Sequence, residues 1–231
     1  MLYTEQSVRD NLRNRDGKRV FFLGKEDRLT CAAREYLKRE GIEILPAQAA
    51  RPVRYRILGG GFSEEKPEHM THLNGEYLVR KTHPRIAFRG MMDSLEGEIL
   101  LCQQQIPVVK EELGEILALA REMVACDVLQ RPLEEKKLCA LTGEEIRKRS
   151  HFPQDYYGQP HFMPECTDDP QILLLNRLRA WVRMAELRAV DAFSDREGNL
   201  TREDLVRGLN RMSSMVYLLM IRLKSGKGRF R

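Results

Sequence analysis

The sequence contains no apolar run near the roughly 20 residues that a membrane-spanning helix needs. Its first ten residues, MLYTEQSVRD, lack the apolar core of a signal peptide. Low-complexity segments and internal repeats are also absent, and 42% hydrophobic and 32% charged residues make an ordinary globular composition. These absences argue against a membrane-spanning helix and a membrane partner, and 231 residues predict one substantial core or one domain with a small appendage.

Cysteine is scarce and irregularly placed. The five residues are odd in number, lie far apart and form no CxxC pair: Cys31, Cys102, Cys126, Cys139 and Cys166. This pattern fits a reducing cytosol better than a disulfide framework. The five histidines form neither HxxxH nor HExxH, so a zinc site has little support and we expect no metal site among the protein residues.

Charge is not concentrated in any one part of the chain. The formal net charge of +5 is spread along the sequence. It suits an anionic small ligand as well as a nucleic acid, so it does not choose between them. A helical nucleic-acid binder has only this charge in its favour, and steep salt dependence of DNA binding would support it.

The first 50 residues are predicted to form a compact helix–strand appendage. Residues 20–23 and 42–45 have the composition of short strands. Between them, Thr30 is a candidate N-cap for a helix through Arg39, and Gly41 is a candidate stop. A unit of this size buries little core alone, so we expect it to act as a lid or a docking element.

Residues 51–80 are predicted to form a linker. Prolines, three consecutive glycines at 59–61 and the acidic segment SEEKPEH give this part of the chain a loop-like composition. Three glycines could wrap a phosphate, but no helix start follows them at the spacing of a phosphate-binding loop. A flexible connector is therefore the stronger interpretation.

From residue 81 onward the sequence predicts helices. His83-Pro84 marks a boundary, because the residue before proline avoids the helical conformation. Apolar residues then recur at helical spacing in two segments separated by Pro107. A short helix over 143–150 should begin with a capping box made by Thr142 and Glu145.

The last helix is predicted to begin at Thr201, with Asp204 completing a second capping box. Four long amphipathic helices and a short one result from this pattern. We therefore expect an all-α fold, a five-helix bundle over residues 81–231, with a small N-terminal α/β appendage.

Residues 170–193 form the longest predicted helix, which opens with Asp169 and Pro170. Arg179, Arg183 and Glu186 share one face of it, flanked by apolar side chains. The two arginines repel each other, so an anionic group should lie against them. This charged stripe is either a solvated face or a functional site or subunit interface. The apolar seam is predicted to comprise Leu174, Leu178, Trp181, Ala185 and Ala192.

Asp93 stands one residue off the apolar seam of its own helix. A desolvated carboxylate there needs a cation, and Arg179 is a candidate. On the last helix, Asn210, Ser214 and Tyr217 form a polar line. On spacing alone we interpret these three as ordinary surface positions.

Five motifs occur in order along the chain: HPRIAFRGMMDSLEGEI, DVLQRPL, SHFPQDYYGQPHFMPE, RLRAWVRMAELRAV and LNRMSSMVYLLMI. Together they resemble the ethanolamine-utilisation type of ATP:cob(I)alamin adenosyltransferases and, more distantly, the propanediol-utilisation type of corrinoid adenosyltransferases. The resemblance covers about residues 71–224. It implies an enzyme in which the Co(I) centre of reduced cobalamin attacks the 5′ carbon of ATP and expels triphosphate.

The resemblance also implies a setting. The bundle would assemble into homo-oligomers, trimers by resemblance, with ATP and corrinoid bound between subunits and Mg2+ on the phosphates. The expected location is the cytoplasm, with the interior of a bacterial microcompartment as one option. A corrinoid reductase or the microcompartment shell would be a partner, and breakdown of ethanolamine or a related compound the pathway served.

Catalytic roles follow from the same resemblance. The signature R-x-x-x-R-x-A-E includes Arg179, and the signature G-x-x-D-x-L includes Asp93, which pairs with that arginine in the family. Phe162, in the FMP segment, resembles the aromatic residue that displaces the lower cobalt ligand. The nucleophile is the cobalt of the substrate, so the protein needs no Ser, Cys or His nucleophile.

Ligand-binding roles follow as well. Arg183 and Glu186 belong to the arginine signature, and Asn210 matches the nucleotide contact of the L-N-R signature. Arg183, Lys81 and Arg85 are expected to neutralise the leaving triphosphate together with Mg2+.

The sequence departs from the family pattern in two places. Many ethanolamine-type members carry a His followed by a Cys-Cys-x-x-Cys metal motif before the first bundle helix, whereas no cysteine lies between Cys31 and Cys102 here. The Gly-rich ATP motif of the propanediol type is also missing. Thr71 and Lys81 are expected to take its place, which makes 51–80 a possible ATP-contacting loop.

These departures favour one alternative, a non-catalytic corrinoid-binding or scaffolding bundle derived from the same fold. The joint presence of Asp93, Arg179, Arg183 and Asn210 argues against it, because a scaffold has no need for that set.

Overall fold

The computed structural model describes residues 1–50, 55–75 and 77–226. The chain divides into two compact units, Met1–His83 and Pro84–Arg231, and each described part has its own buried apolar cluster. Within the described residues, no helix has the length and apolar character needed to cross a membrane.

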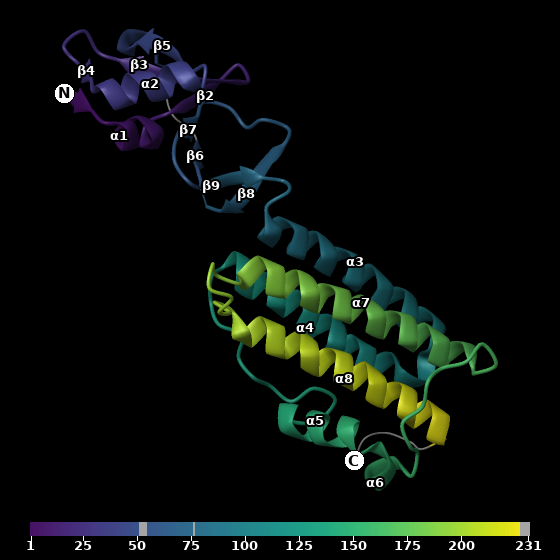
Figure 1. The fold of residues 1–231 in the computed structure, drawn as a ribbon. Helices are drawn as coiled ribbons and strands as arrows, with labels where there is room; N and C mark the ends of the chain where they lie inside the picture. Colours follow the sequence, from purple (N-terminus) through teal and green to yellow (C-terminus); the bar gives the residue numbers. More distant parts are fainter. Residues whose placement is uncertain (51–54, 76, 227–231) are drawn as a thin grey trace. The chain divides into compact units, whose positions relative to one another are not determined.

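The N-terminal unit is built on a seven-stranded sheet with the strand order β5-β3-β2-β7-β6-β9-β8 (Figure 1). Helix α2 packs with α1 over an apolar cluster that contains Val8, Phe21 and Leu37. The strands of this sheet are β2 (Arg13–Arg15), β3 (Lys18–Leu23), β5 (Glu43–Pro46), β6 (Tyr55–Ile57), β7 (Phe62–Ser63), β8 (Met70–Asn74) and β9 (Tyr77–Arg80). The other elements are β1 (Leu2–Tyr3), α1 (Glu5–Asp10), β4 (Arg28–Leu29), α2 (Cys31–Arg39) and the short 3-10 helix Ala47–Ala49.

The helix–strand prediction for the first 50 residues is confirmed in its elements. Thr30 caps α2 by accepting a hydrogen bond from the Ala33 amide at 3.2 Å, and Gly41 follows the helix with a φ of +62°. Strands β3 and β5 pair in parallel on either side of α2 in the sequence. A parallel pair needs such a crossover, which explains the order of these elements.

The linker prediction for residues 51–80 is wrong, because this segment contributes four strands of the sheet, β6 to β9, so the α/β part of the chain is larger than the small appendage predicted and the fold is not all-α. Strands β6 and β7 are antiparallel, and Gly59, Gly60 and Gly61 connect them with φ angles of +91°, +115° and +89°. Three successive positive φ values require glycine. The glycines therefore make a hairpin turn, not a flexible connector. Strands of two to five residues are too short to show a clear alternation in the sequence.

The described part of the helical unit, residues 84–226, contains four long helices that lie alongside one another, with two short helices packed against α8 (Figure 1). The long helices are α3 (Pro84–Gln105), α4 (Lys110–Val128), α7 (Pro170–Phe193) and α8 (Glu203–Ser225). The short ones are α5 (Gly143–His151) and α6 (Pro153–Tyr157), and the 3-10 helix Pro107–Val109 joins α3 to α4. A helical bundle is thus observed, although α6 was not predicted and the arrangement is not a simple five-helix one.

Helix starts in this unit follow local signals, with one exception. Pro84 begins α3, Asp169 caps α7 by accepting from the Gln171 amide at 2.7 Å, and the capping box of Thr142 on α5 is present. The second predicted capping box is wrong, because α8 begins at Glu203. The Thr201 hydroxyl instead donates to the Phe193 carbonyl, and its predicted partner, the Asp204 carboxylate, accepts from the Leu133 amide.

The seam predicted on α7 also needs correction. Leu178 and Ala185 are fully buried as expected, but Leu174, Trp181 and Ala192 are only partly buried. The buried stripe instead includes Leu175 and Val182, which the sequence pattern placed beside the charged residues. The rotation of the core face turns Arg179 and Arg183 away from the centre of the bundle.

Candidate functional site

A cavity of about 730 Å³ opens between the segment before α7, helix α7 itself and helix α8. It brings together four residues that separate sequence motifs predicted as site residues, namely Phe162, Arg179, Arg183 and Asn210. The remaining lining residues are Ser150, His151, His161, Met163, Pro164, Asn176, Ser213, Ser214, Tyr217 and Met220.

Helix α7 positions the two arginines of the cavity. Arg179 and Arg183 are one turn apart, and the neighbouring Leu178 and Val182 are fully buried and fix the helix face. Within the described residues, neither guanidinium forms an ion pair with a carboxylate. Two cations without counter-charges on one side of a cavity are suited to an anionic ligand.

Arg179 lies over the ring of Tyr217 on α8, with 5.2 Å from the guanidinium carbon to the ring centroid. A cation above an aromatic face is attracted by the ring quadrupole, so this contact holds Arg179 in the cavity without neutralising it. The ring of Phe162 stacks on Tyr217 at 6.4 Å between centroids. Burial raises the pKa of the Tyr217 phenol.

His161 fixes the orientation of Tyr217. Its Nε2 lies 3.1 Å from the carbonyl oxygen of His151, and its Nδ1 lies 2.9 Å from the Tyr217 hydroxyl. A carbonyl can only accept, so Nε2 carries the proton, and in neutral His161 the hydroxyl of Tyr217 donates to Nδ1. The interpretation of Ser214 and Tyr217 as ordinary surface positions is therefore wrong, since both line the cavity.

Asn210 is held from two sides. Its Nδ2 donates to Glu186 Oε1 at 3.1 Å, and its Oδ1 accepts from Arg211 Nη1 at 2.9 Å. Glu186 itself is not among the lining residues, so it reaches the cavity only through Asn210. The spacing of Asn210, Ser214 and Tyr217 on one side of α8 was visible in the sequence, but nothing in that spacing indicated which element covers them.

Arg85 does not join this cavity, although it was predicted to contact phosphate. Its Nε donates to Asp127 Oδ1 at 2.9 Å and its Nη2 donates to the Asp127 carbonyl at 2.9 Å. Arg89 Nε binds the other carboxylate oxygen at 2.6 Å, and Asp127 is fully buried. A buried carboxylate must be paired, so Arg85 has a structural role as the partner of Asp127.

The predicted pair between Asp93 and Arg179 is not formed within the described part of the chain. Asp93 is exposed, because its neighbours Met92 and Leu95 take the buried face of α3. Helices α3 and α7 are instead linked by an ion pair that the sequence analysis missed, Arg177 Nε to Glu98 Oε1 at 2.5 Å.

Thr71 and Lys81 belong to the N-terminal unit. Thr71 is half-buried on β8, opposite Val79 of β9. Lys81 is exposed, and its Nζ lies 4.0 Å from a carboxylate oxygen of Glu68. Their predicted contact with ATP phosphates stays a prediction. Across the residues that the structure describes, no three His, Cys, Asp or Glu side chains gather in a way that could hold a metal ion.

Comparison with known proteins gives consistent matches. A family model described as cobalamin adenosyltransferase matches residues 62–223. The chain is 33% identical over 158 residues to the corrinoid adenosyltransferase EutT of Escherichia coli K12, and 32% identical over 158 residues to the protein of the same name from Salmonella typhimurium LT2. Each alignment covers 68% of this chain and 59% of the relative, so the chain matches about three fifths of the length of these relatives.

Proposed function

Because the chain belongs to the cobalamin adenosyltransferase family, we propose that it transfers the 5′-deoxyadenosyl group of ATP to the cobalt of cob(I)alamin and releases triphosphate. The observation that supports this proposal is the cavity that gathers Phe162, Arg179, Arg183 and Asn210. Four residues from three separate motifs meet there, and none of the four belongs to the fully buried core, although Phe162 packs against its edge.

The arginines suit the departure of triphosphate. As the bond between the 5′ carbon and its oxygen breaks, the leaving triphosphate gains negative charge, and cations already in position stabilise that charge. Arg179 is oriented by the Tyr217 ring, and Arg183 lies one turn further along α7. The electron pair that forms the new bond comes from the cobalt of the corrinoid substrate, so the protein need only bind, orient and exclude water.

The other lining residues suit the two substrates. Asn210 is fixed by Glu186 and Arg211, so its amide is ready to contact a nucleotide. Phe162 presents an aromatic face beside Tyr217, a surface suited to the flat corrinoid ring on the side of its lower ligand. These roles for Asn210 and Phe162 remain part of the proposal.

The described lining of the cavity contains no carboxylate, so a Mg2+ ion that arrives with ATP would be held chiefly by the ATP phosphates. Mg2+ is commonly held by one or two carboxylates together with substrate phosphates. Glu186 is a carboxylate adjacent to the lining through its hydrogen bond with Asn210. Bound there, Mg2+ would offset charge on the triphosphate. We expect chelation followed by Mg2+ alone to restore activity, and a required stoichiometric iron or zinc content would contradict this.

We also propose that the chain acts as a homo-oligomer, with a trimer as the form that the resemblance implies. Helix α7 exposes Met184, Leu187 and Val190, which are 48%, 62% and 37% accessible. Apolar side chains grouped on one exposed helix face favour contact with another subunit. Asp93 has no partner within the described chain, so a neighbouring copy is the source that we propose for its arginine.

The cellular setting is proposed from the resemblance and from the named relatives. We place the enzyme in the cytoplasm, with a bacterial microcompartment and a corrinoid reductase as its proposed surroundings. Ethanolamine breakdown is the pathway that the name EutT suggests.

One assay tests the activity directly. Chemically reduced cobalamin and ATP are mixed with the protein, and absorbance follows the appearance of the light-sensitive cobalt–carbon bond. We expect turnover with the native chain and a large loss with Arg183→Gln. Corrinoid binding without turnover, in the presence of Mg2+ and ATP, would instead support the non-catalytic scaffold.

A further inference from the structure

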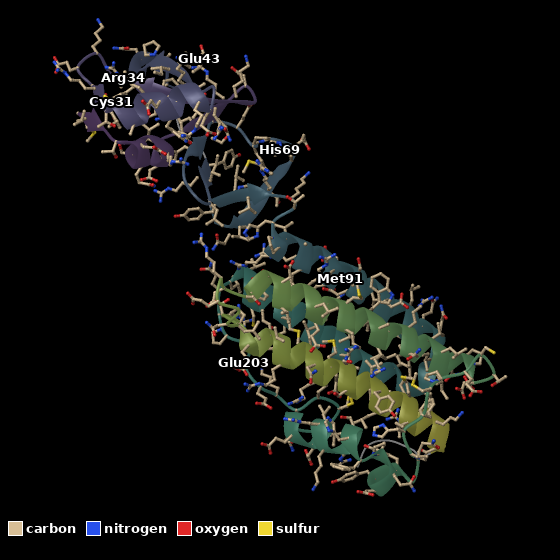
Figure 2. The ribbon with its side chains drawn as sticks, viewed as in Figure 1. Cys31, Arg34, Glu43, His69, Met91 and Glu203 are labelled. Carbon is tan, nitrogen blue, oxygen red and sulfur yellow. The ribbon has the colours of Figure 1, made fainter. Side chains whose placement is uncertain are left out.

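A second cavity, of about 810 Å³, lies within the N-terminal unit. Part of its lining is apolar, including Leu12, Met70 and Val79, all less than a tenth exposed. The described residues that line it include three arginines and two histidines but no aspartate or glutamate: Arg9, Arg19, Arg80, His69 and His83. Figure 2 labels one of them, His69. A mixture of apolar surface and convergent cations is typical of a site for a small organic anion.

Two of the arginines are held in place by carboxylates outside the lining, and one of them also lies over the ring of Tyr36, which is part of the lining. Arg9 donates to Glu5 Oε1 from Nε at 3.1 Å and from Nη2 at 2.6 Å, and its guanidinium carbon lies 4.1 Å from the centroid of the Tyr36 ring. Arg19 Nη2 donates to Glu40 at 3.2 Å. A guanidinium has five N–H donors, so each arginine keeps donors for a ligand while its position is fixed.

The third arginine has no such partner. Arg80 is exposed on β9, opposite Met70 of β8, and forms no hydrogen bond or ion pair through its side chain within the described residues. The carboxylates of Glu5 and Glu40 offset Arg9 and Arg19, so Arg80 supplies the uncompensated positive charge of this cavity.

The glycine turn between β6 and β7 forms another part of the lining. Gly60 donates its amide to the Ile57 carbonyl at 3.1 Å, whereas the amides of Gly59 and Gly61 donate to no acceptor in the described parts of the chain. A side chain at position 61 would meet the Leu12 carbonyl at 2.8 Å. Glycine there therefore lets the turn pack against the residues after α1, where Gly59, Gly60 and Gly61 form part of the wall.

A carboxylate also limits where an anion can bind. Asp10 Oδ1 would lie 3.7 Å from a Cβ built at Gly60, and the same oxygen accepts a hydrogen bond from Gln6 Nε2 at 2.9 Å. Negative charge beside Gly60 repels an anion from that end of the turn. The guanidinium groups are thus the favoured position for phosphate oxygens.

We propose that this cavity binds a phosphorylated small molecule, with its phosphates on Arg9, Arg19 and Arg80 and its organic part on Leu12, Met70 and Val79. The site goes beyond the proposed adenosyl transfer, which requires one nucleotide site only. ATP and inorganic triphosphate share the phosphate chemistry that the arginines recognise, and the experiment separates them.

Methionine methyl resonances read the two cavities of the intact chain separately. Met70 lines the N-terminal cavity and Met220 lines the cavity of the helical unit. The protein, labelled with ¹³C in its methionine methyl groups, is titrated with inorganic triphosphate, with ATP and with adenosine, and Met70→Leu assigns the signal. We expect triphosphate or ATP to shift the Met70 signal to saturation, and adenosine alone to leave it unchanged.

Matched arginine variants test the assignment. Arg80→Gln should raise the Kd read at Met70 about tenfold, the loss expected for a charge-assisted hydrogen bond. Arg34, labelled on α2 in Figure 2, is exposed and outside the lining, so Arg34→Gln makes the same charge change and should leave the Kd within about twofold.

Three results would overturn the site. These are a Met70 signal unmoved by millimolar triphosphate and ATP, a response to adenosine alone, and equal weakening by the Arg34 and Arg80 variants. If the Met220 signal does not change with ATP, this would count against ATP binding in the helical cavity and against the proposed function. It would not affect the conclusion drawn from the Met70 signal about the N-terminal cavity.

Discussion

Two arginine pairs of the helical unit have the same i, i+4 spacing and opposite surroundings. Arg85 and Arg89 on α3 both bind the fully buried carboxylate of Asp127. Arg179 and Arg183 on α7 face a cavity and form no ion pair with a carboxylate in the described residues. The presence of a buried counter-charge, and not the spacing, separates arginines that stabilise a fold from arginines that await a ligand.

The difference has an energetic side. Removing one partner of a buried ion pair leaves an uncompensated charge, so Asp127, Arg85 and Arg89 depend on one another. Arg179 and Arg183 are at least partly exposed, so water solvates their charges when no ligand is bound. Their side chains can therefore be changed without unfolding the protein, whereas substitution of Asp127 should lower the stability of the whole bundle.

Asp127→Ala should have the largest effect on stability. It leaves two guanidinium groups without their counter-charge, so we expect the free energy of unfolding to fall by about 3–5 kcal/mol. Urea denaturation measures this change. Asp155→Ala is the matched control, since Asp155 on α6 is exposed and outside the cavity, and this substitution should change the free energy by less than about 0.5 kcal/mol. Equal effects of the two substitutions would remove the distinction between the arginine pairs.

Arg179→Gln and Arg183→Gln should show the reverse pattern. Loss of one positioned charge at the leaving group is expected to lower kcat about 100- to 1000-fold. The free energy of unfolding should change by less than about 0.5 kcal/mol. Arg188→Gln, on the exposed side of the same helix and outside the cavity, is the control. Native turnover in both cavity variants would mean that Arg179 and Arg183 are surface residues without a role in catalysis.

Asp93→Asn sharpens the comparison by asking whether Arg179 acquires a carboxylate in the assembled protein. If a neighbouring copy supplies Asp93, the substitution should misplace the arginine and lower turnover by about 100-fold, while the secondary structure of the chain is retained. The double variant Asp93→Arg with Arg179→Asp should recover part of the activity. Light scattering that gives a fully active monomer would rule out this pairing.

Much of the helical unit could be predicted from the sequence, because its signals are local. Prolines and capping residues act within one turn, so the starts of α3, α5 and α7 were found. The prediction that Thr201 caps α8 was wrong because its hydroxyl donates to the carbonyl of Phe193, eight residues earlier. The sheet was not predicted for a related reason. Strand β7 has only two residues, and it is defined by its pairing with β2 and β6, which are distant signals.

The site divides in the same way. The resemblance gave Phe162, Arg179, Arg183 and Asn210, which the structure gathers in one cavity. Their companions could not be found from spacing, because His161 meets Tyr217 across 56 residues of sequence. The contact between Arg85 and the triphosphate stays a prediction, and the structure adds a partner for Arg85 that the sequence did not indicate, because Asp127 lies 42 residues away and the apolar pattern around it gave no sign of a buried carboxylate.

The smallest expected effect concerns Tyr217, which holds Arg179 without neutralising it. Tyr217→Phe keeps the ring under the guanidinium but loses the hydrogen bond to His161, so turnover should fall about fivefold, the equivalent of about 1 kcal/mol. Tyr217→Leu also removes the cation–π contact, worth about 0.5–2 kcal/mol, so turnover of this variant should be lower still. Tyr156→Phe, outside the cavity, is the control.

The kinetic pattern separates positioning from simple packing. A misplaced Arg179 should lower kcat more than it raises KM for ATP, whereas a loosened cavity should change KM first. Since burial raises the pKa of Tyr217, its phenol stays protonated at neutral and mildly alkaline pH, and the ratio of native to Tyr217→Phe rates should be flat there. Equal rates for Tyr217→Phe and Tyr217→Leu would show that the ring does not hold the arginine, and the cation would then owe its position to helix α7 alone.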